Sequence, residues 1–246
     1  MKRPEASKAL KLCIMQHPLS LSTMLKPGGH SHLSVVATRQ ADSLECRVRF
    51  LEMPFPIALF MSAFITSDIH IDHAKILSFA TPDGSPLRPY SCLEEMQQDL
   101  EERWNKKVNK KDTVYCLGDI AFSKTGLRLM ERFNGRKILI AGNHDRLPAK
   151  LYLQYFEDIR GAYFHHGDST MLGGLIFTHI PVHPGGLVGH YRGNVHGHLH
   201  SHLVYTDDGE VDKRYFNACL ERNNFEPVAL EDIKAYFKAN GRSSDV

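Results

Sequence analysis

From residue 61 onward, the chain contains short apolar runs, each followed by a polar side chain that could bind a ligand. These runs most strongly constrain its fold. Segments with helical spacing separate runs that have the length of buried strands. The clearest runs span residues 63–66, 113–117, 136–141 and 174–179. Strands and helices in alternation predict an α/β fold, in which ligands bind beyond the carboxyl ends of the strands. We therefore expect the side chains that follow these runs to share one site.

Helices and further strands are expected where start and stop signals are clear. A capping box, Ser91 with Glu94, predicts a helix that continues to Val108 with apolar residues along one face. A second helix over residues 125–133 ends at an Asn-Gly pair, and a third covers residues 230–239. After residue 160 the strands become denser, and they are expected at residues 193–197, 202–206 and 214–219.

Five strand ends carry short motifs of Asp, Asn and His. In chain order the motifs are Asp68-Ile-His70, Gly118-Asp119, Gly142-Asn143-His144-Asp145, His179 and Gly197-His198-Leu199-His200. A single Asp-x-His or Gly-Asp pair is common in ordinary turns and indicates little by itself. The conjunction of all five at strand ends, in a chain with fifteen histidines, indicates a metal centre.

The residue types fit a centre that holds two metal ions. The first motif provides a carboxylate and an imidazole, and Asp119 follows a glycine that permits close approach, so its carboxylate can bridge two cations. Asn143 offers a neutral oxygen, which limits the excess of negative charge. His198 and His200 can each reach a different metal. Nitrogen and oxygen ligands without thiolates suit Mn, Fe, Zn or Ni better than iron–sulfur clusters or calcium.

In this order the motifs resemble the signature of the calcineurin-like metallophosphoesterases, which is D-x-H, G-D, G-N-H-(D/E), H and G-H-x-H. The resemblance covers residues 61 to about 235. It implies a four-layer α/β/β/α sandwich with a dinuclear metal site at the strand ends, and two divalent ions, for which Mn²⁺ is our first expectation. The implied ligands are Asp68, His70 and His200 for one metal, Asn143, His179 and His198 for the other, and Asp119 as the bridge.

The chain departs from the protein Ser/Thr phosphatase branch of that family. Those enzymes continue G-D with a further Asp and Arg-Gly and use G-N-H-E, whereas Ile-Ala-Phe-Ser follows Asp119 here and the third motif ends in Asp145. The pattern is similar instead to small bacterial or phage-type phosphoesterases. We therefore expect hydrolysis of a nucleotide-like or small phosphodiester, or of a phosphomonoester, rather than of a phosphoprotein. With a net charge of +2, stable nucleic-acid binding is not expected.

The expected mechanism is attack on the phosphoester by a hydroxide that bridges the two metals. His144, beside the ligand Asn143, is expected to protonate the leaving oxygen, and Asp145 is expected to orient His144. The alternatives are a non-catalytic, metal-binding interaction scaffold of the same fold and a metallo-β-lactamase-type hydrolase with the signature H-x-H-x-D-H. The stretch 68–73 differs from that signature only at its first position, but the later motifs have no place in such an enzyme.

Several further residues have candidate roles near the site. A glycine-rich loop after the fourth run contains His183, His190 and Arg192, which we expect to contact substrate. Substrate specificity is expected to lie in this loop and in residues 81–90. His73 is expected to cap or pack the following helix rather than to bind metal.

Residues 1–60 differ in character from the domain expected at 61–246. The first 60 residues carry eight Lys/Arg and four Asp/Glu, have no clear period, and match nothing in the resembled family. We expect a poorly structured extension, and Met61 as the start of translation in the cell. The apolar stretch 55–65 is shorter than the roughly 20 residues that a membrane span needs. Five cysteines without a paired pattern, and no export signal, favour a cytoplasmic location.

Overall fold

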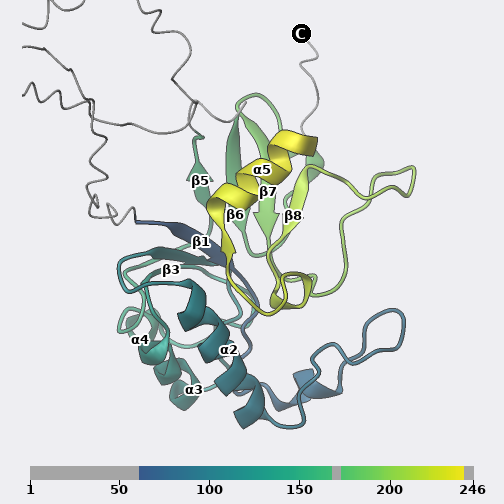
Figure 1. The fold of residues 1–246 in the computed structure, drawn as a ribbon. Coiled ribbons are helices and arrows are strands. Elements are labelled where there is room, and N and C mark those ends of the chain that lie inside the picture. The colour runs from purple at the N-terminus through teal and green to yellow at the C-terminus, as the bar shows by residue number, and fades with distance from the viewer. Residues whose placement is uncertain (1–60, 168–172, 241–246) are drawn as a thin grey trace, which may run out of the picture. The chain divides into compact units, whose positions relative to one another are not determined.

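The computed structural model describes residues 61–167 and 173–240, which carry the colours of the ribbon in Figure 1. These residues belong to one compact unit, Leu59–Val246. The N-terminal extension expected at residues 1–60 lies outside the described residues. The division of the chain at residue 60 and the start at Met61 therefore stay predictions.

The first sheet has five strands in the order β4-β3-β2-β1-β9. Its strands are β1 (Ala63–Thr66), β2 (Thr113–Cys116), β3 (Arg136–Ile140), β4 (Asp158–Arg160) and β9 (Val228–Ala229). Strands β1 to β4 run parallel, and β9 adds an antiparallel edge beside β1. Thr66 pairs with Cys116, which pairs with Leu139, so the carboxyl ends of β1, β2 and β3 reach the same edge.

The second sheet has four strands in the order β5-β6-β7-β8. Its strands are β5 (Tyr163–His165), β6 (Gly174–Thr178), β7 (Tyr191–His196) and β8 (Tyr215–Asn217). Strands β6, β7 and β8 run parallel, and β5 is antiparallel to β6. Thr178 pairs with His196 at the carboxyl ends of β6 and β7, whereas Gly174 pairs with Tyr191 at the opposite edge. The residues that follow β6 and β7 therefore emerge together.

The three expected helices begin close to the positions that the sequence predicts, and a fourth, short helix at Ala149–Tyr152 was not predicted. The helices are α2 (Leu93–Lys107), α3 (Lys124–Arg128), α4 (Ala149–Tyr152) and α5 (Leu230–Asn240), with 3₁₀ helices at Ala74–Ser78, Leu129–Arg132, Pro184–Gly186 and Leu220–Arg222. The expected pairing at the start of α2 is wrong by one residue. Ser91 donates through its backbone N and its hydroxyl to Glu95, at 2.7 and 2.5 Å, and not to Glu94. Because Cys92 is the N-cap, Glu95 occupies the third helical position, from which a carboxylate reaches back.

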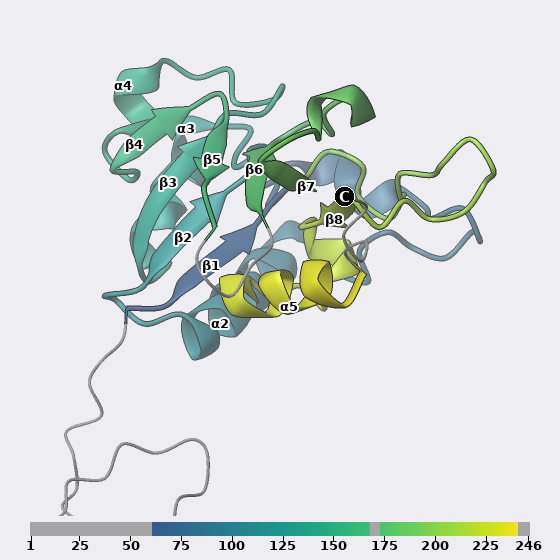
Figure 2. The same cartoon turned by 90° about the horizontal axis from the view of Figure 1, so that it is seen from above.

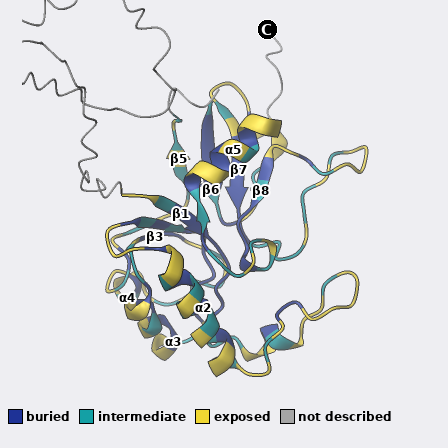
Figure 3. Ribbon diagram, in the orientation of Figure 1, coloured by how far each residue is buried: buried dark blue, intermediate teal, exposed yellow. Residues whose placement is uncertain are grey.

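Hydrophobic cores lie on both faces of the first sheet. Residues Met96, Leu100 and Trp104 of α2 pack with strand residues on one face. On the other face, Ile65, Leu117 and Ile140 meet Leu175, Phe177 and Val195 of the second sheet. Helix α5 joins this inter-sheet core and contacts β1 (Figure 2). Figure 3 shows the resulting pattern, with buried strands and an exposed outer side of α2. The α/β class and the two-sheet sandwich are confirmed.

One expected strand does not form. Residues 202–206 hold only an isolated bridge between Tyr205 and Val211. An Asp-Gly turn reverses the chain here, and Thr206 N donates to the carbonyl oxygen of Glu210 at 2.8 Å. The segment is thus a small hairpin outside both sheets. Among the described residues, no helix combines the length and hydropathy that crossing a bilayer requires.

Candidate metal centre

The backbone leaves strand geometry at most of the residues expected to bind metal. Five of them have positive φ angles, a region that non-glycine residues rarely adopt. These angles are 58° at Asp68, 57° at His70, 56° at Asp119, 68° at His198 and 49° at His200. Such a conformation costs about 1–3 kcal/mol per residue and persists only where the surrounding contacts impose it. Its concentration at these five positions points to function rather than to folding.

Motif glycines allow the loops to approach one another. A Cβ atom built on Gly197 would fall on the hydroxyl of Ser67 and 2.5 Å from Asp68 Oδ2. At Gly118, where φ is +92°, a Cβ atom would lie 2.5 Å from the backbone N of Gly142 and 2.8 Å from His179 Nδ1. Any side chain at these positions would therefore push the strand ends apart.

Asp68, His70 and His200 form the first cluster of candidate ligands, in which all three ligand atoms lie within 4.8 Å of one another. Asp68 Oδ1 lies 3.4 Å from His70 Nε2 and 3.9 Å from His200 Nε2. Both Asp68 Oδ1 and His70 Nε2 are buried and have no hydrogen-bond partner within the described part of the chain. Because an unpaired buried carboxylate oxygen is costly, this cluster fits a bound cation.

Electrostatics at Asp68 and His70 favour the protonation states that a metal needs. Burial opposes ionisation of Asp68, but the nearby imidazoles of His70, His200 and His179 lower its pKa well below the usual value. Burial lowers the pKa of His70 and keeps its ring neutral. A carboxylate and a neutral imidazole are the forms that bind cations. At His200, burial lowers the pKa, but the carboxylates of Glu221 and Asp68 outweigh it and raise the pKa above the usual value.

Asp119, Asn143 and His179 form the second cluster, and a carboxylate oxygen of Asp68 also lies within 4.8 Å of the ligand atoms of Asp119 and His179. His179 Nε2 lies 2.8 Å from Asn143 Oδ1 and 3.6 Å from Asp119 Oδ1. The other ring nitrogen, Nδ1, lies 2.7 Å from the carbonyl oxygen of Leu117 and must donate to it. In the neutral tautomer that this contact selects, Nε2 directs its lone pair toward Asn143 and Asp119, where a cation could be shared by all three side chains. The ring of His198 lies 5.1 Å from that of His179 between centroids.

Asp119 lies between the two clusters. Its Oδ2 atom is 3.6 Å from His70 Nε2 in the first cluster, and its Oδ1 atom is 3.6 Å from His179 Nε2 in the second. The side chain is 2% exposed. One carboxylate thus faces two sets of ligands, which is the arrangement that a pair of cations with a shared ligand requires.

A family model for calcineurin-like phosphoesterases matches residues 61–237. The chain belongs to the calcineurin-like phosphoesterase family. Members of this family hydrolyse phosphoester bonds with the help of two divalent metals, and the clusters above supply ligand groups for them.

Proteins similar to this phosphoesterase in sequence or in fold come from archaea, phages and bacteria. An uncharacterized protein of Methanocaldococcus jannaschii is 30% identical over 174 residues, which are 69% of this chain and 88% of that protein. The gene 66 protein of Mycobacterium phage L5 is 29% identical over 162 residues, which are 63% and 69% of the two chains. A crystal structure of a protein of unknown function from Aquifex aeolicus shares the fold, with a TM-score of 0.52 and 21% identity over 71% of this chain and 98% of that one.

The two residues expected to act in catalysis have different surroundings in the phosphoesterase. His144 is half-buried, and its ring lies 5.9 Å from that of His70 and 5.0 Å from that of Phe122 between centroids. Asp145 does not orient this ring through its carboxylate. Its oxygens accept the backbone N–H groups of Asp119 and Gly142 at 2.8 Å and that of Ile120 at 3.0 Å. The expected orienting role is therefore corrected: Asp145 ties two ligand-bearing loops together.

The structure does not bring all expected substrate residues to the clusters. His183 follows β6 at the edge that carries the clusters, and its side chain is exposed. His190 and Arg192 lie at the start of β7, where Gly174 and Tyr191 pair, at the opposite edge of the sheet. The parallel pairing of β6 with β7 explains this, because the connecting loop must return to the amino ends of the strands. The expected position of these two residues near the site was wrong.

Three residues that contact the candidate metal ligands or their loops belong to none of the five motifs. His73 Nδ1 lies 2.9 Å from His70 Nδ1, and its ring stacks on Phe122 at 4.0 Å. Burial, with His70 nearby, lowers the pKa of His73 to about 4, so the neutral His73 ring can accept a hydrogen bond from His70 Nδ1. Arg88 and Glu221 also contact the ligand loops. Only His73 could have been found from the sequence, because it is a histidine three residues after His70; Arg88 and Glu221 have no such signal.

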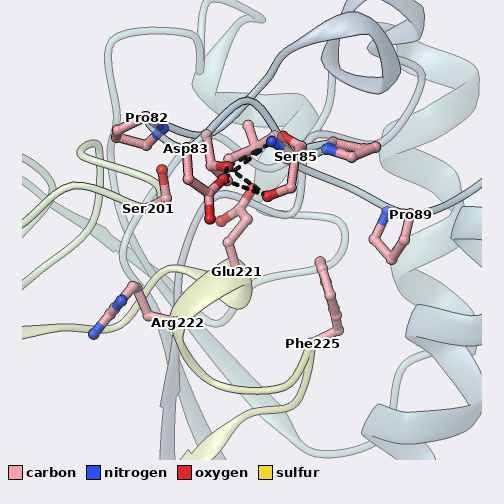
Figure 4. A pocket seen from close by; sticks show the side chains of 11 residues that line it. Pro82, Asp83, Ser85, Pro89, Ser201, Glu221, Arg222 and Phe225 are labelled. Carbon is pink, nitrogen blue, oxygen red and sulfur yellow. Dashed lines mark hydrogen bonds between the residues drawn. The ribbon is translucent and has the colours of Figure 1, made fainter.

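A pocket of about 460 Å³ adjoins the first cluster. The segment 81–89 forms one wall, and Ser201, Glu221, Arg222 and Phe225 form the other (Figure 4). Ser201 follows His200 directly, so the pocket begins one residue from a candidate ligand. Residues 81–90, expected to influence specificity, thus line a space next to the clusters.

Proposed function

We propose that this phosphoesterase is a Mn²⁺-dependent phosphodiesterase acting on small or nucleotide-like diesters. The observation that carries the proposal is the position of Asp119, with one carboxylate oxygen 3.6 Å from a histidine nitrogen in each cluster. Two divalent cations held there would activate a water molecule and neutralise charge that develops on the phosphate. The first would be held by Asp68, His70 and His200, the second by Asn143, His179 and His198, with Asp119 shared.

The remaining residues of the site would orient the ligands and move one proton. His144 would donate a proton to the leaving oxygen from its half-buried position beside Asn143. His73 would accept a hydrogen bond from His70 Nδ1, so that His70 Nε2 keeps its lone pair toward the first cluster. Asp145 would keep the loops of Asp119 and Gly142 at their spacing through backbone hydrogen bonds.

A diester is favoured over a phosphoprotein monoester by the charges beside the clusters. A phosphomonoester carries a second negative charge that needs a cationic side chain. Arg88, whose guanidinium touches the ligand loops, is 1% exposed and already bonded to Glu221 and to two carbonyl oxygens. Phe122 stands three residues after Asp119 and is 38% exposed. These surroundings suit the single charge of a diester.

The pocket beside His200 is where we place the ester group of the substrate. Its walls carry prolines and Phe225, which suit a flat apolar group, and its rim carries Arg222. The variant Ser85→Trp would fill this space without touching a candidate ligand. It should lower kcat/KM for bis-p-nitrophenyl phosphate more than tenfold relative to methyl p-nitrophenyl phosphate. The control Ser78→Trp, at an exposed position outside the pocket, should leave the ratio unchanged, and equal losses for both substrates with Ser85→Trp would contradict the placement.

A reducing cytoplasm remains our proposed location for the protein. Within the described ranges, Cys92, Cys116 and Cys219 are unpaired, which suits such a compartment. Fractionation of the native cells with an antibody against the domain would test this, and recovery of the protein outside the cytoplasmic fraction would contradict it.

The decisive experiment for the activity is a metal-reconstitution assay. Protein freed of metal with a chelator should be inactive, and Mn²⁺ should restore hydrolysis of bis-p-nitrophenyl phosphate in preference to p-nitrophenyl phosphate. Asp119→Asn should fail to recover because it weakens both metal sites. Full activity in the chelator would refute a metal-dependent reaction. A preference for the monoester would refute the diesterase, and binding of metal without turnover of either compound would favour the scaffold.

A further inference from the structure

Arg88 is a buried cation among the loops that carry the first cluster. Its side chain is 1% exposed. Nη1 donates to the carbonyl oxygen of Ile69 at 2.8 Å, and Nη2 donates to the carbonyl oxygen of Asp68. The planar guanidinium suits such paired donation, which a lysine could not reproduce. Arg88 therefore holds the backbone between two candidate ligands, Asp68 and His70, in the region where φ is positive at both.

Glu221 completes the pairing of Arg88 and contacts a third ligand. Its Oε1 atom lies 2.9 Å from Arg88 Nε and 2.8 Å from Arg88 Nη2. The same oxygen lies 3.1 Å from His200 Nδ1. Because Nδ1 donates to this carboxylate, the lone pair of the His200 ring is on Nε2, which lies 3.9 Å from Asp68 Oδ1. Glu221 therefore fixes both the tautomer and the direction of the ring.

We propose that Arg88 and Glu221 are positioning residues for the metal site of Asp68, His70 and His200, and that they do not serve the second metal site. The pair joins the loop after β1, the segment 81–90 and the 3₁₀ helix Leu220–Arg222. The proposal rests on the proposed function in one respect, which is that each cluster holds its own cation.

A gain in folding stability does not explain why Arg88 and Glu221 are buried as an ion pair. The desolvation of two buried charges commonly costs as much as their attraction returns, so a buried ion pair is weak evidence of stabilisation. Arg88 and Glu221 bond not only to each other but also to the segments that carry the ligands: Arg88 to the carbonyl oxygens of Asp68 and Ile69, and Glu221 to His200. A carboxylate that accepts the free N–H of a metal-binding histidine typically contributes about 10- to 100-fold to metal affinity.

The second cluster is oriented by other groups. His179 donates through Nδ1 to the carbonyl oxygen of Leu117, at 2.7 Å, and not to a carboxylate. Asp119 Oδ1 accepts the backbone N–H of His144 at 2.8 Å. Because these contacts do not involve Arg88 or Glu221, loss of the pair should affect the two metal sites unequally.

Calorimetric titration of the metal-free protein with Mn²⁺ tests this inequality. The wild type should show two binding events. Glu221→Gln keeps an oxygen acceptor and the side-chain volume, so the fold should survive, and one event should weaken about 10- to 100-fold while the other changes less than about twofold. Arg88→Lys, which keeps the charge but not the paired donors, should weaken the same event. Glu226→Gln is the matched control, because Glu226 lies nearby in an exposed ion pair with Lys107 at 3.3 Å.

A double-mutant comparison shows whether Glu221 acts through His200. In a His200→Ala background, adding Glu221→Gln should change Mn²⁺ affinity less than about threefold, since the ring that Glu221 orients is gone. The visible spectrum of the Co²⁺-loaded protein should change with Glu221→Gln but not with Glu226→Gln. Equal weakening of both sites, no weakening, or a full effect in the His200→Ala background would overturn the proposal. A wild type that does not bind two ions would instead contradict the proposed function.

Discussion

His179 donates its Nδ1 proton to the carbonyl oxygen of Leu117 across 2.7 Å. Because a carbonyl oxygen only accepts, the ring has one orientation and one neutral tautomer, with the Nε2 lone pair toward Asn143 and Asp119. The end of β2 therefore sets the direction of a ligand that follows β6. This relationship links the two sheets at the proposed metal centre.

Removing this ring should empty one of two metal sites. We expect His179→Ala to bind about one Mn²⁺ per chain, and the wild type two, because Asp68, His70 and His200 do not depend on His179. Metal content after gel filtration, measured by plasma mass spectrometry, gives the result. His166→Ala is the control, since His166 contacts His190 and Tyr191 at the other edge of the sheet. Unchanged metal content in His179→Ala would remove it from the ligand set.

Replacing His144 should slow catalysis without removing metal. We expect His144→Ala to retain its Mn²⁺ and to lose about 10²–10⁴ in kcat with an alkyl leaving group, the usual contribution of an acid–base group. The loss should be much smaller with p-nitrophenolate, which leaves without a proton. His183→Ala should show no such dependence. Equal losses for both leaving groups would show that His144 is not the proton donor.

Asp145 should matter for stability rather than for proton transfer. Asp145→Ala removes the acceptor of three backbone N–H groups, at Asp119, Ile120 and Gly142, and we expect it to lower the free energy of unfolding by about 3 kcal/mol. Urea unfolding of the metal-free protein measures this. A variant with wild-type stability, and with the leaving-group dependence of His144→Ala, would restore the orienting role that the geometry argues against.

His196 should make stability depend on pH. It is 1% exposed, and burial lowers its pKa to about 4, although its hydrogen bond to Gly197 opposes the shift. In the unfolded chain the pKa of His196 is near 6.5, so as the pH falls the unfolded state binds the proton first. The unfolding free energy therefore keeps its full value above about pH 6.5 and decreases as the pH drops toward 4.

The variant His196→Asn keeps an N–H donor but does not titrate. Between about pH 7.5 and 5.5, it should lose about 1 kcal/mol less unfolding free energy than the wild type. Urea midpoints in the presence of a chelator would measure the difference. Parallel pH profiles for the two proteins would show that His196 is not held neutral by burial.

The sequence predicted the strands that lead to the clusters because each is a continuous apolar run. Strands β1, β2, β3 and β6 begin at the expected residues. Strands β4, β5 and β9 were not predicted, because they have only two or three residues and are half-buried or exposed. Their pairing depends on the sheet already being present, and the sequence carries no local signal for it.

The site also combines residues that have a local sequence signal with residues that have none. Asp68, His70, Asp119 and His179 follow strands directly, and the structure brings their side chains together. Arg88 and Glu221 are 133 residues apart and belong to no motif, so only the folded chain reveals their contact. Proximity in sequence to His179 was misleading for Arg192, because a parallel connection returns the chain to the opposite edge.

Anomalous diffraction from crystals soaked in Mn²⁺ tests the central claim most directly. Two peaks roughly 3.5–4 Å apart, one on each side of the Asp119 carboxylate, are the predicted result. One peak should lie against His70 and His200, and the other against Asn143 and His179. A single peak, or two peaks that do not share Asp119, would contradict a two-metal centre bridged by this residue.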